Sequence, residues 1–232
     1  MKKYIAIVLL IFTLCACNQN KGDDGKVRRF TFAISSSVKL PSNLNINDTS
    51  IEIEVFKLND KAFLIIDAPG NYNFEDVLTT LQKNNSSVLV LLESLSPLER
   101  VYKLDQEHEY TPLEGQLISI QENTKKYVLT LEIINDPELK KEYKRVHGKG
   151  MAWPEITANM KEVGIKDMEI YWEGYQAYLI MDTKMDFDFA TDGEKWSTLP
   201  RESEWQEYVA KFQKVDPQSK AAEKWQTMIL QK

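Results

Sequence analysis

Two stretches of this chain repeat one pattern, and the repeat constrains the fold more than any other feature of the sequence. Glu54–Asp67 (EVFKLNDKAFLIID) aligns without a gap with Glu169–Asp182 (EIYWEGYQAYLIMD). Both show β-type alternation on either side of a central turn, which is typical of a hairpin. The identical aligned residues are Glu54/Glu169, Ala62/Ala177, Leu64/Leu179, Ile65/Ile180 and Asp67/Asp182. We interpret the match as an internal duplication; two unrelated hairpins of similar pattern are the alternative.

The second copy carries further secondary-structure signals around its hairpin. We predict a strand over Lys126–Ile134, a helix opened by Asn135-Asp136-Pro137, a helix over Pro154–Val163, the hairpin over Asp167–Asp182, a helix over Glu202–Gln213 and a strand over Trp225–Leu230. The order strand, helix, two strands, helix, strand is that of a ferredoxin-like unit. The fold class is therefore α+β.

The two copies differ between their first strand and their hairpin. The second copy has a helical stretch there that includes Tyr143 and His147, whereas the first copy has Ser35–Ser50, rich in Ser, Asn and Pro. Such a composition is typical of a loop. We therefore expect the first copy to be a scaffold that lacks the functional site. The expected divisions are a signal segment over 1–16, a tether over 17–27, a degenerate repeat over 28–110, a linker over 111–124 and a site-bearing domain over 125–232.

His147 is the candidate for proton transfer. It is one of two histidines, the other being His108, and it lies four residues after Tyr143 in a helical pattern. Residues at i and i+4 share a helix face, so the two side chains are expected to lie together. An imidazole changes charge near neutral pH, which suits it to give and take protons. A solvent-exposed helix histidine is the alternative.

The first residues indicate a processed and anchored protein. Lys2 and Lys3 precede an apolar run that is short for a transmembrane helix and typical of a signal peptide. The run ends in Leu14–Cys17 (LCAC), which resembles a bacterial lipobox and implies cleavage before a lipidated Cys17. An ordinary secretory signal with a stray cysteine is the alternative. We expect a lipid-anchored protein of the bacterial cell envelope, on the periplasmic face or the outer surface.

Charge and cysteine content exclude several partners. A net charge of −6 argues against nucleic acid and against an anionic lipid surface, so the lipid anchor is the expected contact with membrane. Beyond Cys15 and Cys17 the chain has no cysteine, which excludes disulfides and a thiolate metal site. The acidic run from Asp182 to Asp192 lacks the glycine and closing glutamate of a calcium loop. We expect neither a metal nor a cofactor.

Several motifs together resemble one enzyme family. The motifs are EYKRVH, WPEI, VGIKDMEIYWEG, LIMD, EW, KFQ and EKWQTM, spread over residues 125–232. They are similar to those of the L-rhamnose mutarotase family, which includes relatives that act on L-fucose. The resemblance implies a dimeric-type α+β barrel, in which two ferredoxin-like units pair through their sheets, and interconversion of the α and β anomers of a deoxyhexose without a metal.

The resemblance also implies roles for individual residues. His147 corresponds to the general acid/base, and the expected sugar-binding residues are Tyr143, Trp205, Gln206, Met168 and Tyr171. In one respect the chain departs from the family pattern. The family usually has three residues between the histidine and Trp-Pro, whereas Gly148–Ala152 provides five here.

The prediction is a sugar mutarotase that acts on L-rhamnose, L-fucose or a related deoxyhexose by histidine acid/base ring opening. In this hypothesis the first repeat pairs with the second inside one chain and replaces the usual partner subunit; a homodimer is the alternative. A non-catalytic carbohydrate-binding lipoprotein is the main functional alternative, and an envelope scaffold is a third.

Overall fold

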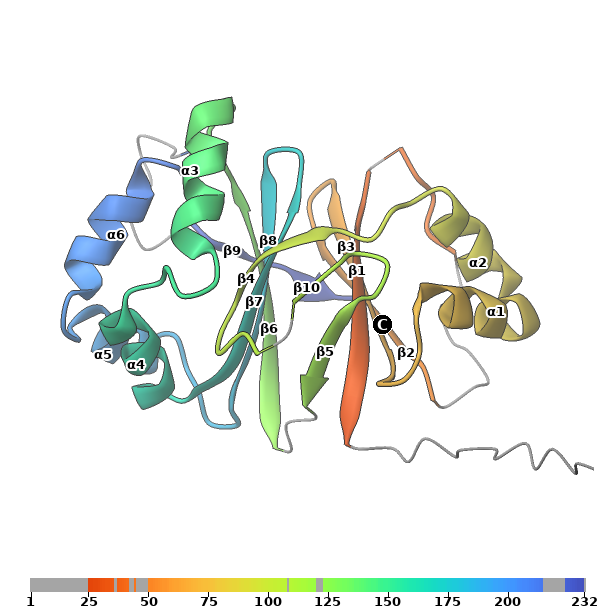
Figure 1. Ribbon diagram of the computed structural model, residues 1–232, viewed down its shortest axis with the longest axis horizontal. Helices are drawn as coiled ribbons and strands as arrows, with labels where there is room; N and C mark the ends of the chain where they lie inside the picture. Colours follow the sequence, from red (N-terminus) through yellow and green to blue (C-terminus); the bar gives the residue numbers. More distant parts are fainter. Residues whose placement is uncertain are drawn as a thin grey trace, which may run out of the picture.

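The protein forms two antiparallel β-sheets that lie face to face, with helices on both outer sides (Figure 1). The computed structural model describes residues 25–35, 37–41, 44, 50–107, 109–119, 123–214 and 224–231. The signal segment 1–16, Cys17, most of the tether 17–27 and His108 lie outside these residues. The predicted α+β class is confirmed. None of the described helices is long and apolar enough to cross a membrane.

The first sheet has the strand order β10-β2-β3-β1-β5. Its strands are β1 (Lys26–Ile34), β2 (Glu52–Leu58), β3 (Lys61–Pro69), β5 (Gln116–Ser119) and β10 (Ile229–Leu230). Two helices, α1 (Phe74–Asn84) and α2 (Ser86–Glu93), cover its outer face. The described residues between β1 and β2 form neither helix nor strand, in agreement with the predicted loop.

The second sheet has the order β4-β7-β8-β6-β9. Its strands are β4 (Glu99–Lys103), β6 (Thr124–Glu132), β7 (Ile165–Glu173), β8 (Gln176–Lys184) and β9 (Gln226–Thr227). Its outer face carries α3 (Pro137–His147), α4 (Pro154–Glu162), α5 (Asp192–Ser197) and α6 (Glu202–Ala210). The two predicted hairpins are confirmed as β2–β3 and β7–β8.

The two sheets exchange edge strands. β4 follows α2 in the chain, yet it pairs with β7 of the second sheet, and β10 crosses in the opposite direction to pair with β2 (Figure 1). The strand predicted over Trp225–Leu230 is therefore two short strands in different sheets, with the buried Met228 between them. The segment 111–124, expected to be a linker, contributes β5, which pairs with β1.

Both faces of the central strands are buried, and this explains their nearly continuous apolar runs. Successive side chains of a strand point to opposite faces. On β8, Tyr178 and Ile180 therefore join the core between the sheets, while Leu179 and Met181 pack toward the helices. On β3, Phe63 belongs to the core between the sheets and stacks on Tyr178 at 4.7 Å between ring centroids.

Candidate active site

Helix α3 carries the two residues on which the predicted chemistry depends. The Asp136 side chain accepts hydrogen bonds from the backbone N–H groups of Glu138 and Leu139, at 2.8 and 3.0 Å, and so caps the helix start. Pro137 occupies the first turn, where a missing N–H costs nothing. The rings of Tyr143 and His147 stack at 3.9 Å between centroids, so the predicted shared face is confirmed.

His147 is a buried, neutral base. Its Nδ1 lies 2.9 Å from the backbone carbonyl oxygen of Tyr143, and because a carbonyl only accepts, Nδ1 carries the proton. Nε2 is consequently left as a hydrogen-bond acceptor. Burial lowers the pKa of His147 to about 4, while the hydrogen bond to Tyr143 opposes part of that shift.

Aromatic side chains surround this imidazole. Trp205 of α6 meets it edge-on at 5.5 Å between ring centroids, and Tyr102 of β4 does so at 6.1 Å. Tyr143 in turn stacks on Trp172 of β7 at 5.0 Å. Burial raises the pKa of Tyr143 above its usual value, so its phenol stays protonated at neutral pH. The imidazole is thus oriented by rings on several sides.

His147 lines a cavity of about 900 Å³ between the second sheet and helices α3 to α6. This volume lies within the range of small-molecule sites, which is roughly 300–1,000 Å³. The predicted site residues on its wall are Tyr143, His147, Met168, Trp205 and Gln206. Five of the six residues predicted to contact a sugar or move its protons are thus brought to one cavity.

Tyr171 is the exception and lies outside this cavity. It is three residues after Met168 on β7, and an odd spacing along a strand places the two side chains on opposite faces. The Tyr171 side chain is fully buried between the two sheets, where its hydroxyl donates to Glu169 Oε2 at 3.0 Å. We therefore remove Tyr171 from the set of site residues.

The first half of the chain contributes to the cavity, contrary to the expected division into a scaffold and a site-bearing domain. Tyr102 comes from β4, the strand that crosses to the second sheet, and it lines the cavity opposite His147. Its hydroxyl donates to Met160 Sδ of α4 at 3.7 Å. A local sequence pattern does not reveal an exchanged strand, so this residue was missed.

A buried carboxylate that the sequence did not single out also lines the cavity. Glu202, the first residue of α6, is 2% exposed. Its Oε1 accepts hydrogen bonds from Trp196 Nε1 at 2.7 Å and from Asn159 Nδ2 at 3.0 Å. Burial raises the pKa of Glu202, and hydrogen bonds from its neutral neighbours oppose that shift. The cavity therefore holds an imidazole and a carboxyl group.

The segment Gly148–Ala152 forms the turn between α3 and α4. Gly148 caps the end of α3, and Gly150 adopts a left-handed conformation with φ of 72° in open space. The longer spacing is accommodated in this turn, so His147 remains the last residue of α3 and stays buried. Trp153 starts α4 and packs against Trp205 at 5.3 Å between ring centroids.

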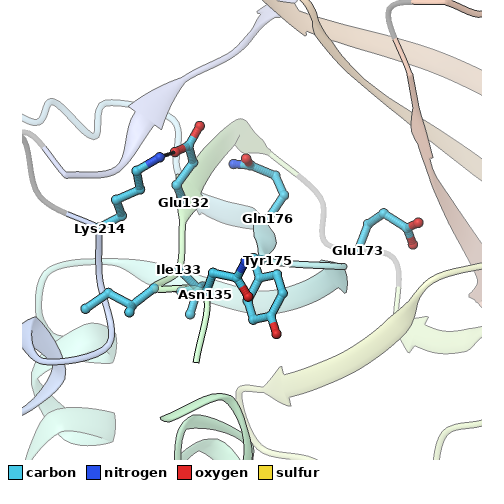
Figure 2. A pocket seen from close by; sticks show the side chains of 8 residues that line it. Glu132, Ile133, Asn135, Glu173, Tyr175, Gln176 and Lys214 are labelled. Atoms are coloured by element: carbon cyan, nitrogen blue, oxygen red, sulfur yellow. Dashed lines mark hydrogen bonds and ion pairs between the residues drawn. The ribbon is translucent and has the colours of Figure 1, made fainter. Parts of the chain in front are cut away.

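A second hollow, of about 640 Å³, lies near the β7–β8 turn and the start of α3. Figure 2 shows Lys214 directed at Glu132 on its wall. Glu132 is paired with both Lys214 and Lys61, which lower its pKa and keep it ionised. With its carboxylate held in ion pairs, this hollow is the weaker candidate for proton transfer.

Comparisons with known proteins agree with this geometry. A profile of the L-rhamnose mutarotase family matches residues 126–230. An L-fucose mutarotase of Xanthomonas campestris pv. campestris is 33% identical over 99 residues, which cover 43% of this chain and 78% of that protein. A UPF0734 protein of Dictyostelium discoideum is 34% identical over 110 residues, or 46% of this chain and 86% of its own length.

These matches define a protein with a sugar-mutarotase type of fold and site in its second half. The chain belongs to the L-rhamnose mutarotase family, as its motifs predicted. Among solved structures, an anthrone oxidase-like protein aligns with 90% of this chain and 93% of its own at 9% identity, with a TM-score of 0.37, which is too low to relate the two folds.

Proposed function

We propose that this protein is a mutarotase that interconverts the anomers of L-rhamnose, L-fucose or a related neutral deoxyhexose. The observation that carries the proposal is the buried, neutral His147, whose Nε2 is free to accept a proton on a cavity of monosaccharide size. Family membership supports the same type of reaction.

The cavity wall favours an uncharged sugar. Aromatic and aliphatic side chains dominate it, and Lys224 is the one lysine or arginine that it includes among the described residues. The indole of Trp205 offers a flat apolar surface for the C–H face of a pyranose, while Gln206 beside it can hydrogen-bond hydroxyl groups. A phosphorylated or acidic sugar would find little compensating charge there.

In the proposed reaction His147 begins as a general base. Nε2 takes the proton of the anomeric hydroxyl, the C1–O1 bond becomes a carbonyl and the bond from C1 to the ring oxygen breaks. Rotation about the C1–C2 bond presents the other face of the aldehyde, and His147 returns its proton to O1 when the ring closes. Tyr143, stacked on the imidazole, holds it in this orientation.

Exchange spectroscopy tests the proposal directly. Saturation of one anomeric proton signal of L-rhamnose or L-fucose reports the exchange rate, which the protein should raise above the uncatalysed rate. His147→Gln should abolish the acceleration while circular dichroism and the melting curve show a folded protein. Acceleration that survives this substitution would remove His147 from the mechanism. Saturation transfer from protein to sugar without faster exchange would instead select a carbohydrate-binding module.

We also infer that the two halves are ferredoxin-like repeats that pair within one chain and replace a partner subunit. Three observations support this inference. The exchanged strands β4 and β10 occupy matching edges beside β7 and β2. The aligned residues Phe63 and Tyr178 stack on each other. Light scattering of the purified protein should then give the mass of a monomer; a dimer mass would contradict the inference.

The third observation concerns ion pairs between the halves. Arg29 Nη1 lies 3.3 Å from Glu169 Oε2, and Lys126 pairs with Glu54. Arg29 aligns with Lys126 and Glu169 with Glu54, so the two pairs are related by exchange of the halves. Such reciprocity is expected of an interface with approximate two-fold symmetry.

For localisation, we propose a lipid anchor at Cys17 in a bacterial cell envelope. The support is the signal-like segment and the Leu14–Cys17 motif. Cells that express the protein should incorporate labelled palmitate into it, and Cys17→Ser should prevent incorporation. Label retained in that variant would refute the anchor.

A further inference from the structure

Ring opening requires a second proton-transfer group that His147 alone does not supply. While Nε2 takes the proton from the anomeric hydroxyl, the ring oxygen must gain one as its bond to C1 breaks. These two oxygens sit on the same carbon, yet in the first step the imidazole only removes a proton. A donor positioned near the ring oxygen would complete the reaction.

We propose, building on the mutarotase function above, that Glu202 is this second catalytic residue and donates a proton to the ring oxygen. Glu202 lies one helical turn before Trp205 on α6, and residues at i and i+3 are neighbours on a helix surface. His147 contacts the same Trp205 ring. The imidazole and the carboxyl group therefore flank one indole on the wall of one cavity.

The frame around Glu202 fixes its carboxyl group. Asn159 of α4 and Trp196 of α5 both donate to Oε1, and Asn159 Nδ2 also donates to the backbone oxygen of Pro200 at 2.8 Å. The Gln206 side chain supplies a further hydrogen bond from one turn later on α6. Because Asn159 and Trp196 both use Oε1, Oε2 is the oxygen left for a proton that moves to a ligand.

The facing groups also favour a protonated carboxyl. Asn159, Trp196 and Gln206 are neutral, so no cation among them holds the group ionised. Burial raises the pKa of Glu202 and lowers that of His147 to about 4. Environments that shift an acid upward and a base downward are those expected of an acid/base pair.

The proposed step balances. The O1–H proton moves to His147 Nε2, the electron pair of that bond forms the C1=O1 bond, and the pair of the C1–O5 bond passes to O5. Glu202 Oε2 gives its proton to O5, which leaves an imidazolium, a carboxylate and an open-chain aldehyde. Ring closure on the other face reverses each transfer and restores both groups.

Glu202→Gln provides a selective test because a glutamine oxygen still accepts from Asn159 and Trp196 but does not titrate. In the full chain we expect the exchange rate at saturating L-rhamnose or L-fucose to fall by about a hundredfold. Sugar affinity, measured by saturation transfer, and the melting temperature should stay near wild type. Glu204→Gln, on the exposed side of the same helix, is the matched control and should keep the wild-type rate.

The pH profile separates proton donation from a structural role. Wild-type exchange should fall as pH rises through the Glu202 pKa, Glu202→Gln should lack that fall, and Glu202→Asp should retain it. A Glu202→Gln variant with the wild-type rate and profile would overturn the role of Glu202 and leave the mutarotase function standing. Loss of sugar binding together with rate would also overturn proton donation. A wild-type protein without acceleration would overturn both proposals.

Discussion

At the scale of single residues, burial of His147 has a consequence for stability as well as for chemistry. An imidazole that is 8% exposed and has a pKa of about 4 binds fewer protons in the folded state than in the unfolded chain, where its pKa is near 6.5. Stability therefore rises with pH between about 4 and 6.5 and falls on acidification. At 1.36 kcal/mol per pKa unit, the full effect is about 3 kcal/mol.

The first prediction follows from this difference. Urea unfolding of the wild-type protein should show a loss of about 3 kcal/mol from His147 between pH 7 and pH 4. His147→Phe keeps an aromatic ring against Tyr143 but does not titrate, so its stability should vary less over the same range. Parallel curves for the two proteins would show that His147 titrates normally and is not desolvated.

At the scale of secondary-structure elements, the start of α3 fixes the register of Tyr143 and His147. The Asp136 carboxylate is the cap, and it satisfies two backbone N–H groups that the helix itself leaves free. The second prediction is that Asp136→Ala lowers the free energy of unfolding by about 1 kcal/mol, whereas Asp136→Asn changes it by a few tenths. Chemical denaturation measures both; equal losses would mean that charge, rather than the cap hydrogen bonds, stabilises the helix.

The turn between α4 and β7 leads into the strand that carries Met168. Gly164 has φ of 96°, and a Cβ there would lie 2.6 Å from Lys184 Cδ. The third prediction is that Gly164→Ala costs more than Gly174→Ala. The second glycine has φ of 57° with nothing within 4 Å, so its loss should cost about 1 kcal/mol. Thermal unfolding compares the two directly, and equal shifts would show that Lys184 moves aside freely.

Elements that depend on nearby residues could be predicted from the sequence, and those that depend on distant ones could not. Helix α3 follows from Asp136-Pro137, and the hairpins follow from their alternation and central turns. Strand parity would even have excluded Tyr171, because Met168 faces the cavity. A helix pattern assigned across the whole segment 202–213 left no means of seeing that α6 ends at Ala210.

Tyr102 and Glu202 show what local patterns miss. Tyr102 reaches the cavity only because β4 crosses to the other sheet, a pairing between segments far apart in the chain. Glu202 looks like an ordinary charged residue at a helix start. Its burial results from Asn159 of α4 and Trp196 of α5, which three-dimensional packing brings to it. Motif resemblance found the histidine and the indole, while tertiary structure was needed for the carboxyl group.

At the scale of the whole molecule, the two halves are joined by exchanged strands, by a shared core and by buried charge. Arg29 is 3% exposed and binds Asp67 through two nitrogens at 2.7 and 2.8 Å, as well as Glu169 of the other half. Attraction to these carboxylates raises the pKa of Arg29, while the Arg29 guanidinium lowers the pKa of Asp67 against its burial. Burial raises the pKa of Glu169 in spite of Arg29.

The fourth prediction is that Arg29→Met destabilises the whole protein by about 3–5 kcal/mol at neutral pH, because it leaves two buried carboxylates without their cation. Without Arg29, the pKa of Glu169 should rise further above its unfolded value. The folded variant would then bind more protons than the unfolded chain, so its deficit should shrink as pH falls toward about 4.5.

Unfolding monitored by calorimetry and by tryptophan fluorescence measures this deficit in both halves at once. Because the halves share the core between the sheets, the two probes should give one coincident transition for wild type and variant alike. Lys161→Met, which breaks the exposed pair with Asp105, is the control and should cost less than 1 kcal/mol. If Arg29→Met unfolds in two separate transitions, the halves are independent domains, and the cluster around Arg29 does not couple them.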